Sequence, residues 1–229
     1  MEEPKRKSFL DVVKHNLSLA DRSEPVTRFV YVGSYSGCRD DLQRWMKNNV
    51  KELNEEYKKI VFTGLLLVYP ESVVHLIEAS EEAIYKHLQF VQKDKSSMLK
   101  NVILLPARYF LYMKYFSEWH MAYVTNPPML FDQIDSQELE EVGKQIRNCL
   151  FKIYSLCEYL SNHKKMIDHL KDLSELQHLL PEVTVVEYIL SLTVPEVQNL
   201  KMYLKEFNQV PLIHLYNGKY HRLFLISLG

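Results

Sequence analysis

The chain has 229 residues, enough for one large or two small domains, and its 28 Lys and Arg against 29 Asp and Glu give a formal net charge of −1. Such a balance provides no global field toward nucleic acid or an anionic membrane, so neither is expected as a partner. No run of about 18 apolar residues is present, and the first residues lack the apolar core of a signal peptide. We therefore expect an intracellular protein.

Reactive and metal-binding residues form no recognisable pattern. Cys38, Cys149 and Cys157 are odd in number and lack metal-type spacing, which favours free thiols in a reducing, cytoplasmic compartment. His163 and His169 have no Cys or carboxylate partner at ligand spacing, so no metal is expected. The Walker loop and the G-x-G-x-x-G, G-x-S-x-G and H-E-x-x-H motifs are absent, so the sequence favours a protein that is not an enzyme.

Residues 1–27 are charged and interrupted by proline, which predicts a leader with one short helix. Its apolar stripe would consist of Phe9, Val12, Val13 and Leu17.

Residues 61–79 predict the central hairpin. The segment 61–69 is apolar without a helical stripe, and Pro70-Glu71-Ser72 is turn chemistry before a second apolar run that ends in Glu78. Thr63-Gly64 indicates a kink or bulge where backbones approach closely.

Five further elements surround this hairpin in the prediction. They are a strand at 29–33, a helix capped by Asp40 or Asp41 with a stripe of Leu42, Trp45, Met46, Val50 and Leu53, a helix capped by Ser80, and strands at 101–110 and 119–124. Pro106 marks the strand at 101–110 as an edge or a bulge. The order βαββαββ predicts a ferredoxin-like domain over residues 28–125 with one extra strand.

The remainder, residues 126–229, is predicted to be helical with a terminal hairpin. After the stiff Asn126-Pro127-Pro128, helical patterns cover 136–160 and 166–180, and 181–192 is short and very apolar. A helix capped by Thr193 and entered at Pro195 would bury Val197, Leu200, Leu204 and Phe207. Asn217-Gly218 predicts a hairpin between 212–216 and 220–226. The fold class is thus α+β.

Residues 28–124 resemble the BLUF family, the blue-light sensors that use flavin. The pieces that match are Tyr31 in FVYVG, the FTGLLL strand, VVHLIEAS with Glu78, the helix end Gln92-Lys93-Asp94, and Phe116, Trp119, His120 and Met121 in the pattern F-x-x-W-x-M. The resemblance implies a sheet that carries FAD beside a redox tyrosine. If flavin is retained, the cofactor-binding residues would be Tyr31, His75, Trp119 and Met121.

Two polar contacts of that family are changed. His75 stands where the family keeps the glutamine between tyrosine and flavin, and an imidazole cannot reproduce the rotation of an amide. The position of the family's flavin-gripping asparagine on the first helix falls on Glu56 and Tyr57, while Asn48 and Asn49 lie earlier and Asn54 is out of register.

The sequence therefore predicts a non-enzymatic structural or interaction protein without a cofactor. The whole chain also resembles a vertebrate testis-expressed family, which implies protein partners in sperm, such as axonemal microtubule proteins of the flagellum. The alternative is a flavin-binding light or redox sensor, and a third reading is an enzyme on a ferredoxin-like scaffold. Side chains like Tyr31, His75, Trp119 and Met121 on strands are more often core residues of a sheet than cofactor-binding residues.

Overall fold

The computed structural model describes residues 8–19, 25–93, 98–130 and 134–207. The predicted leader helix is confirmed as α1 (Phe9–Leu19), whose first turn is held by reciprocal bonds between Ser8 and Asp11. The predicted hairpin at 212–226 lies outside the described residues.

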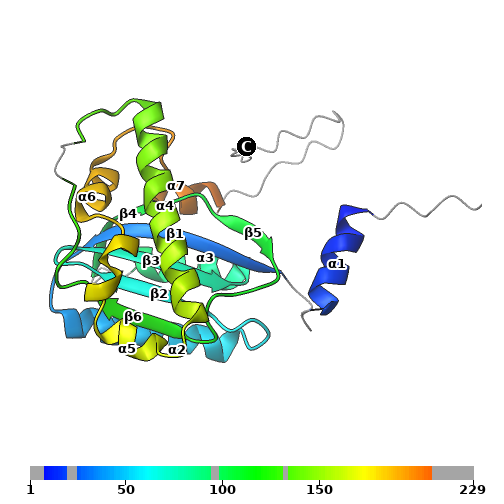
Figure 1. Cartoon of the computed structure of the whole chain (residues 1–229). Helices are drawn as coiled ribbons and strands as arrows, with labels where there is room; N and C mark the ends of the chain where they lie inside the picture. The colour runs from blue at the N-terminus through cyan, green and yellow to red at the C-terminus, as the bar shows by residue number, and fades with distance from the viewer. Residues whose placement is uncertain (1–7, 20–24, 94–97, 131–133, 208–229) are drawn as a thin grey trace, which may run out of the picture.

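One mixed sheet organises the chain (Figure 1). Its strands follow the order β4-β1-β3-β2-β6, and their bounds are β1 Val26–Tyr35, β2 Thr63–Val68, β3 Ser72–Ala79, β4 Leu99–Leu104 and β6 Trp119–Tyr123. The pairs β1–β3, β1–β4 and β2–β3 are antiparallel, and β6 runs parallel to β2. The connecting helices are α2 (Arg39–Glu56) and α3 (Glu81–Lys93). The predicted ferredoxin-like α+β fold with an added strand is confirmed.

The central hairpin has the predicted turn and the predicted close approach. Tyr69 N donates to Ser72 O across the turn at 2.9 Å. Gly64 has a φ of +149°, and a Cβ built there would lie 2.1 Å from the carbonyl oxygen of Leu76. A side chain at this position is excluded, which explains the glycine.

Three local predictions were wrong. The strand expected at 101–110 is divided around Pro106 into β4 and β5 (Arg108–Leu111), because proline has no N–H for a continuous ladder. Both halves pair with β1. The N-cap of α2 is Cys38 rather than Asp40 or Asp41, which lie in the first turn.

The third concerns α7 (Leu200–Phe207), which begins later than the cap predicted at Thr193. Asn199 caps it, accepting a bond from Met202 N at 2.9 Å, while the hydroxyl of Thr193 bonds Gln137. Of the residues expected to be buried by this helix, Leu200 and Leu204 are buried, whereas Phe207 is 58% exposed.

The region from α4 to α6, residues 139–191, covers one face of the sheet. Its helices are α4 (Leu139–Asn162), α5 (Met166–Lys171), the 3₁₀ helix η1 (Ser174–Leu179) and α6 (Val183–Ser191). Figure 1 shows α4 crossing in front of the strands, with α2 and α3 behind them. Alternate residues such as Val30 and Leu65 share a core with Ile153 and Leu156 of α4.

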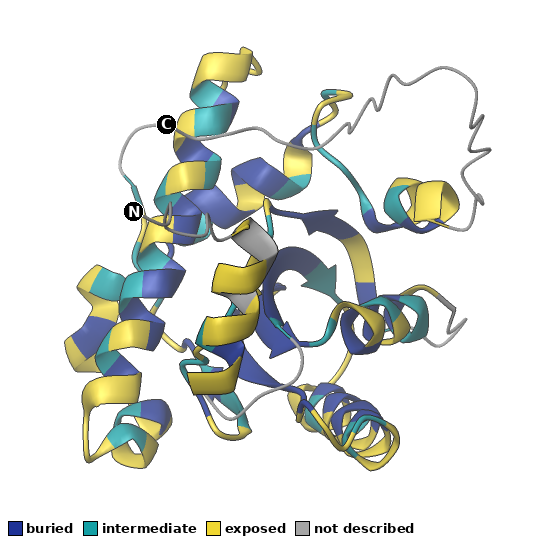
Figure 2. Cartoon of the chain, turned by 90° about the vertical axis from the view of Figure 1, so that its right-hand side faces the viewer, coloured by how far each residue is buried: buried dark blue, intermediate teal, exposed yellow. Residues whose placement is uncertain are grey.

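The opposite face packs against α2, α3 and α7. Here Tyr31 and Leu66 lie in a second core with Leu42 and Leu88. Strands β2 and β3 are consequently buried along their whole length, and exposure is concentrated on the outer sides of the helices (Figure 2).

Candidate functional site

The residues that the sequence selected for a cofactor share one face of the sheet. Tyr31, His75, Leu66 and Met121 are direct neighbours across β1, β3, β2 and β6. Trp119 lies two residues before Met121 on the same face, and Tyr31, Leu66, Trp119 and Met121 belong to or pack against the core under α2 and α3. The structure therefore brings Tyr31, His75 and Met121 into one row, with Trp119 beside it on the same face, and Tyr31 and His75 are fully buried.

Their polar atoms bond to one another and to two further side chains. Trp119 Nε1 donates to His75 Nε2 at 2.9 Å, and His75 Nδ1 lies 2.8 Å from Tyr31 Oη. Tyr31 Oη lies 3.1 Å from Nε2 of His87 on α3, whose Nδ1 lies 2.6 Å from Oδ1 of Asn49 on α2. The result is one unbranched chain of hydrogen bonds from β6 through the sheet to both helices. We call these five residues the polar chain.

The indole fixes the direction of every bond in the polar chain. An indole N–H can only donate, so His75 Nε2 accepts and the neutral ring carries its proton on Nδ1, which donates to Tyr31 Oη. The phenol then donates its own proton to His87 Nε2, and His87 Nδ1–H donates to the amide oxygen of Asn49. Each group between the two ends accepts once and donates once, so no ring nitrogen is unsatisfied.

Burial keeps the titratable side chains of the polar chain uncharged. It lowers the pKa of His87 to about 3 and, together with the neighbouring His87, lowers the pKa of His75 well below its usual value. Burial also raises the pKa of Tyr31 well above its usual value. The phenol and both imidazoles are therefore neutral at physiological pH.

Sequence reasoning missed His87, and it named Asn49 only as lying earlier than the position of the family's flavin-gripping asparagine. Both signals were present, since His87 lies three residues after Ile84 and four before Val91, and Asn49 lies three after Met46 and four before Leu53. Each thus occupies an apolar stripe, where a polar side chain must be buried and must find a partner. Asn54, the out-of-register alternative, instead holds the start of β2, accepting from Phe62 N at 2.6 Å.

The arrangement does not fit a flavin. The resemblance requires a tyrosine, a third-strand side chain and a first-helix asparagine that present polar atoms to a ring. Here Tyr31 Oη, both ring nitrogens of His75 and Oδ1 of Asn49 are bonded within the protein. The rings of His75 and His87 lie 5.4 Å apart between centroids, so the space beside the phenol is filled by imidazole.

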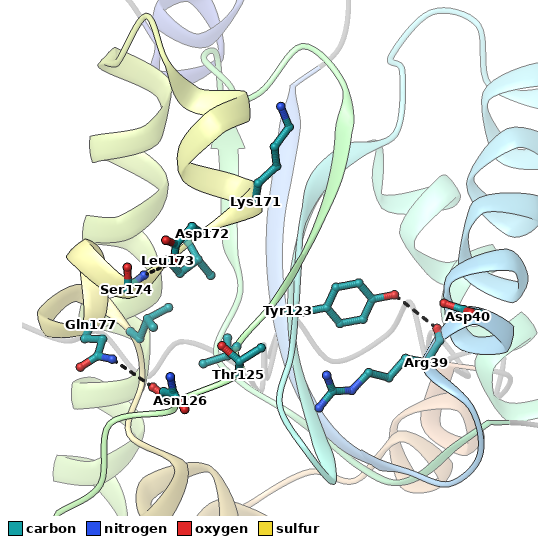
Figure 3. A pocket seen from close by; sticks show the side chains of 12 residues that line it. Arg39, Asp40, Tyr123, Thr125, Asn126, Lys171, Asp172, Leu173, Ser174 and Gln177 are labelled. Carbon is teal, nitrogen blue, oxygen red and sulfur yellow. Dashed lines mark hydrogen bonds between the residues drawn. The ribbon is translucent and has the colours of Figure 1, made fainter.

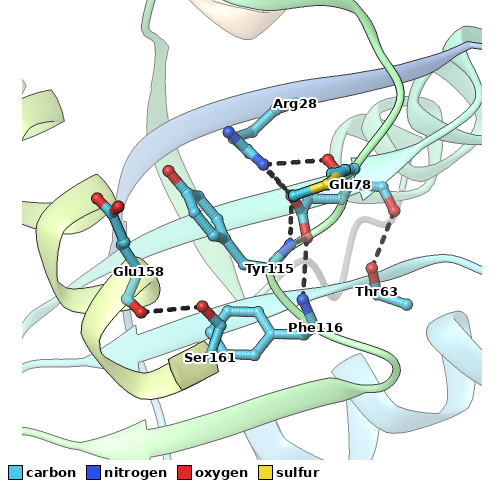
Figure 4. A network of polar contacts seen from close by, with 8 residues as sticks. Arg28, Thr63, Glu78, Tyr115, Phe116, Glu158 and Ser161 are labelled. Atoms are coloured by element: carbon cyan, nitrogen blue, oxygen red, sulfur yellow. Dashed lines mark hydrogen bonds and ion pairs between the residues drawn. The ribbon is translucent and has the colours of Figure 1, made fainter. Parts of the chain in front are cut away.

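A second polar cluster lies on the other face of the sheet (Figure 4). Glu78, fully buried, accepts from Arg28 Nε at 2.8 Å and from Tyr115 N at 2.9 Å. The Arg28 guanidinium also lies 3.7 Å from the centre of the Tyr115 ring. These contacts bind the segment before β6 to β1 and β3. The charge of Glu78 is neutralised by Arg28 and its oxygens accept hydrogen bonds within the protein, so Glu78 has a structural role.

A pocket of about 370 Å³ opens where the start of α2 meets the end of β6 and the segment from α5 to η1 (Figure 3). Arg39 and Lys171 contribute positive charge to its lining, and Asp40 and Asp172 contribute negative charge. Asp172 already accepts a bond from Ser174 N at 3.0 Å. This mixture selects neither an anion nor a cation, so the pocket does not define a chemistry.

Metal ligands and thiols show no site within the described residues. No group of three His, Cys, Asp or Glu side chains there converges on a point. Cys149 and Cys157 are buried free thiols on the core-facing side of α4, and burial raises the pKa of Cys149 to about 12. Among the described helices, none has the length and apolar character needed to span a bilayer.

Fold and site together define the class: an α+β protein with a ferredoxin-like sheet whose central polar residues bond to one another. A family model described as testis-expressed protein 47 matches residues 25–209, which is most of the chain. The chain belongs to this family.

Solved structures of BLUF proteins are also similar to it. "BlrP1 BLUF" matches with 18% identity and a TM-score of 0.36, over 43% of this chain and 65% of that one. BlrP1 of Klebsiella pneumoniae with FMN and cyclic diGMP matches with 20% identity and a TM-score of 0.36, over 43% of this chain and 26% of its own. The photo-activated state of BlsA matches with 16% identity and a TM-score of 0.34, over 72% of this chain and 95% of the BlsA chain. The chain spans less than two thirds of the BlrP1 chains it matches.

Proposed function

We propose that this protein is a non-enzymatic structural or interaction protein, built on a degenerate BLUF-like sheet that holds no flavin. The observation that carries the proposal is the closed polar chain. Tyr31, His75, Trp119 and Asn49 offer their polar atoms to neighbouring side chains and not to a ligand. What the sheet retains is a rigid scaffold.

An exposed apolar surface supports a role in binding other proteins. Tyr109, Phe110, Tyr112 and Met113 follow one another along β5 and the segment after it, and each is 48% to 68% exposed. We call these four residues the β5 patch. Phe110 also has a φ of +58°, a conformation that costs a bulky residue about 1–2 kcal/mol. Exposed aromatic and methionine side chains are typical of protein interfaces.

The setting we propose is the sperm cell, with axonemal microtubule proteins of the flagellum as partners in the cytoplasm. Membership of a testis-expressed family supports the cell type. The balanced charge, 28 basic against 29 acidic residues, favours protein over nucleic acid or membrane as the partner.

The cofactor part of the proposal is tested by the absorption spectrum of the full chain purified after expression with added flavin. We expect no flavin band. Bound flavin with a light-induced red shift that Tyr31→Phe abolishes would replace the proposal with the sensor alternative.

The partner part is tested by capture from sperm-flagellar extract with the full chain. The variant Tyr109→Ser/Phe110→Asn removes two rings from the β5 patch, and asparagine tolerates a positive φ better than phenylalanine. Phe151→Ser, which removes a 70% exposed ring from α4, is the matched control. We expect axonemal proteins to be enriched by the wild type and the control, and lost with the double variant. Equal capture by all three would exclude the β5 patch as the interface.

A further inference from the structure

We propose that the imidazole of His87 is an internal plug: it fills, from within the chain, a ring-sized site between Tyr31 and Asn49 that would otherwise accept a small planar heteroaromatic ligand. This inference rests on the proposed function, in which no flavin is held. It names the residue that closes the site and the chemistry that the site would accept.

The first argument is the complementarity of the two nitrogens of His87. Nε2 accepts from the Tyr31 hydroxyl at 3.1 Å, and Nδ1 donates to Asn49 Oδ1 at 2.6 Å. The two partners come from different elements, β1 and α2, and they present one donor and one acceptor to the same ring. A ligand for this place therefore needs one acceptor and one donor nitrogen on a small ring.

The second argument is the aromatic surround. The ring of His87 is stacked against Tyr31 at 5.9 Å with an interplanar angle of 26°, and the ring of Phe62 lies 5.1 Å away. His75 meets it edge-on at 5.4 Å. Flat faces and edges on several sides favour a planar occupant over an aliphatic one.

The third argument is the neighbouring position on the same helix. Leu88 is fully buried in the same core as Tyr31 and Phe62, and it is purely apolar. If position 87 were occupied only to fill volume, an aliphatic residue would suffice there as well. Such a residue would leave the Tyr31 hydroxyl and the Asn49 amide oxygen buried without these partners, which would destabilise the fold.

The test is rescue of His87→Ala by free imidazole, followed by thermal unfolding at a pH where imidazole is neutral. Leu88→Ala is the matched control, because it opens a cavity on the same helix that lacks this donor and acceptor. Pyrrole is the control probe, because it has the size and the N–H of imidazole but no acceptor nitrogen.

We expect imidazole to raise the Tm of His87→Ala in a saturable way, with a dissociation constant in the millimolar range, and to leave the wild type and Leu88→Ala unaffected. Pyrrole should raise the Tm of His87→Ala less than imidazole does. An equal response of the two variants, or a stronger effect of pyrrole, would overturn the plug. The inference does not require His87→Ala to bind flavin, because the ring system of flavin is much larger than an imidazole.

A measurement on the wild type keeps the inference testable if His87→Ala does not fold. Nitrogen-15 NMR of the imidazoles should show His87 protonated on Nδ1 only and neutral throughout the pH range in which solvent-exposed histidines titrate. A His87 ring that becomes charged in that range would contradict the plug.

The outcomes separate this inference from the proposed function. Wild-type protein that binds flavin would contradict both. Colourless wild-type protein together with a His87→Ala variant that does not respond to imidazole would contradict the plug alone.

Discussion

At the scale of single residues, the fixed donor and acceptor roles in the polar chain make the stability of the fold sensitive to the loss of any one of its members. Because Trp119 can only donate, removing any member leaves a specific buried atom without its partner, and the loss passes to its neighbours. A buried group left unsatisfied costs about 1–3 kcal/mol. The same directionality requires both imidazoles to stay neutral, which makes the stability of the fold dependent on pH.

We predict that the free energy of unfolding falls as the pH is lowered from about 6.5, the ordinary pKa of histidine in an unfolded chain. The folded pKa is depressed for both His75 and His87, to about 3 for the latter, so in this window the unfolded state binds more protons. Each buried histidine then contributes a slope of about 1.4 kcal/mol per pH unit. His75→Gln, which cannot be protonated, should lower the slope by that amount in urea unfolding at a series of pH values. Parallel slopes for variant and wild type would contradict a neutral His75.

The buried ion pair permits a second prediction at this scale. In Arg28–Glu78 the two side chains are 8% and 0% exposed, and Glu78→Gln would leave the guanidinium without its counter-charge. We expect a loss of about 3–5 kcal/mol in the free energy of unfolding. Asp41→Asn breaks the exposed pair with Arg44, whose side chains are 51% and 76% exposed, and should cost less than about 1 kcal/mol. Similar costs for the two variants in urea unfolding would contradict a structural role for Glu78.

The sequence located part of the site around the polar chain. Tyr31, His75, Trp119 and Met121 were selected together, and the sheet register places Tyr31, His75 and Met121 in one row with Trp119 next to it on the same face. His87 was not selected, because on its own a histidine in a helix does not reveal which strand residue it meets. The partner depends on the packing of α3 on β1, a tertiary contact that helical periodicity does not encode.

At the scale of elements, most helices and strands were predictable from apolar patterns and turn chemistry. The exceptions are places where two local signals compete. Thr193 and Asn199 are both capping residue types, and only the bond of Thr193 to Gln137 in the three-dimensional structure removes it from that role. Pro106 signalled an edge or a bulge, but the pattern could not show that β5 would resume on the same strand, β1.

Glycines in two elements yield matched predictions with opposite signs. In Gly64→Ala the new Cβ would meet the Leu76 carbonyl oxygen at 2.1 Å, in a backbone conformation with φ +149°, so we expect a loss of about 3 kcal/mol or more. In Gly143→Ala the nearest atom is the flexible Arg147 Nη1 at 3.2 Å, and alanine favours the helix α4 by about 0.5–1 kcal/mol. Urea unfolding of both variants measures the difference. A Gly64→Ala variant as stable as wild type would show that β2 and β3 are not held this closely.

At the scale of the whole molecule, two layers of helices share one sheet. Strands β2 and β3 are buried at every position and carry apolar residues on both faces, a pattern typical of strands covered on both sides. The sequence alone did not predict a second cover. It could not show which segment provides it, because the apolar stripe of α4 would fit many partners. The structure assigns that cover to α4 and α6, whose buried residues share a core with Val30, Leu65 and Leu76. A chain ending at Asn126 would expose this face.

The shared sheet predicts that both layers unfold together. The two tryptophans, Trp45 and Trp119, pack against the core under α2 and α3, on the opposite face from Ile153 of α4. Ile153→Ala should cost about 2–5 kcal/mol. The loss should move the tryptophan fluorescence midpoint in urea as far as the midpoint measured by far-UV circular dichroism, because removing the α4 layer exposes strands that carry the other core. Phe151→Ala, a 70% exposed neighbour on the same helix, should move neither midpoint appreciably. A fluorescence midpoint unchanged by Ile153→Ala would instead show that the helical layer unfolds independently while the ferredoxin-like sheet and its polar chain stay folded.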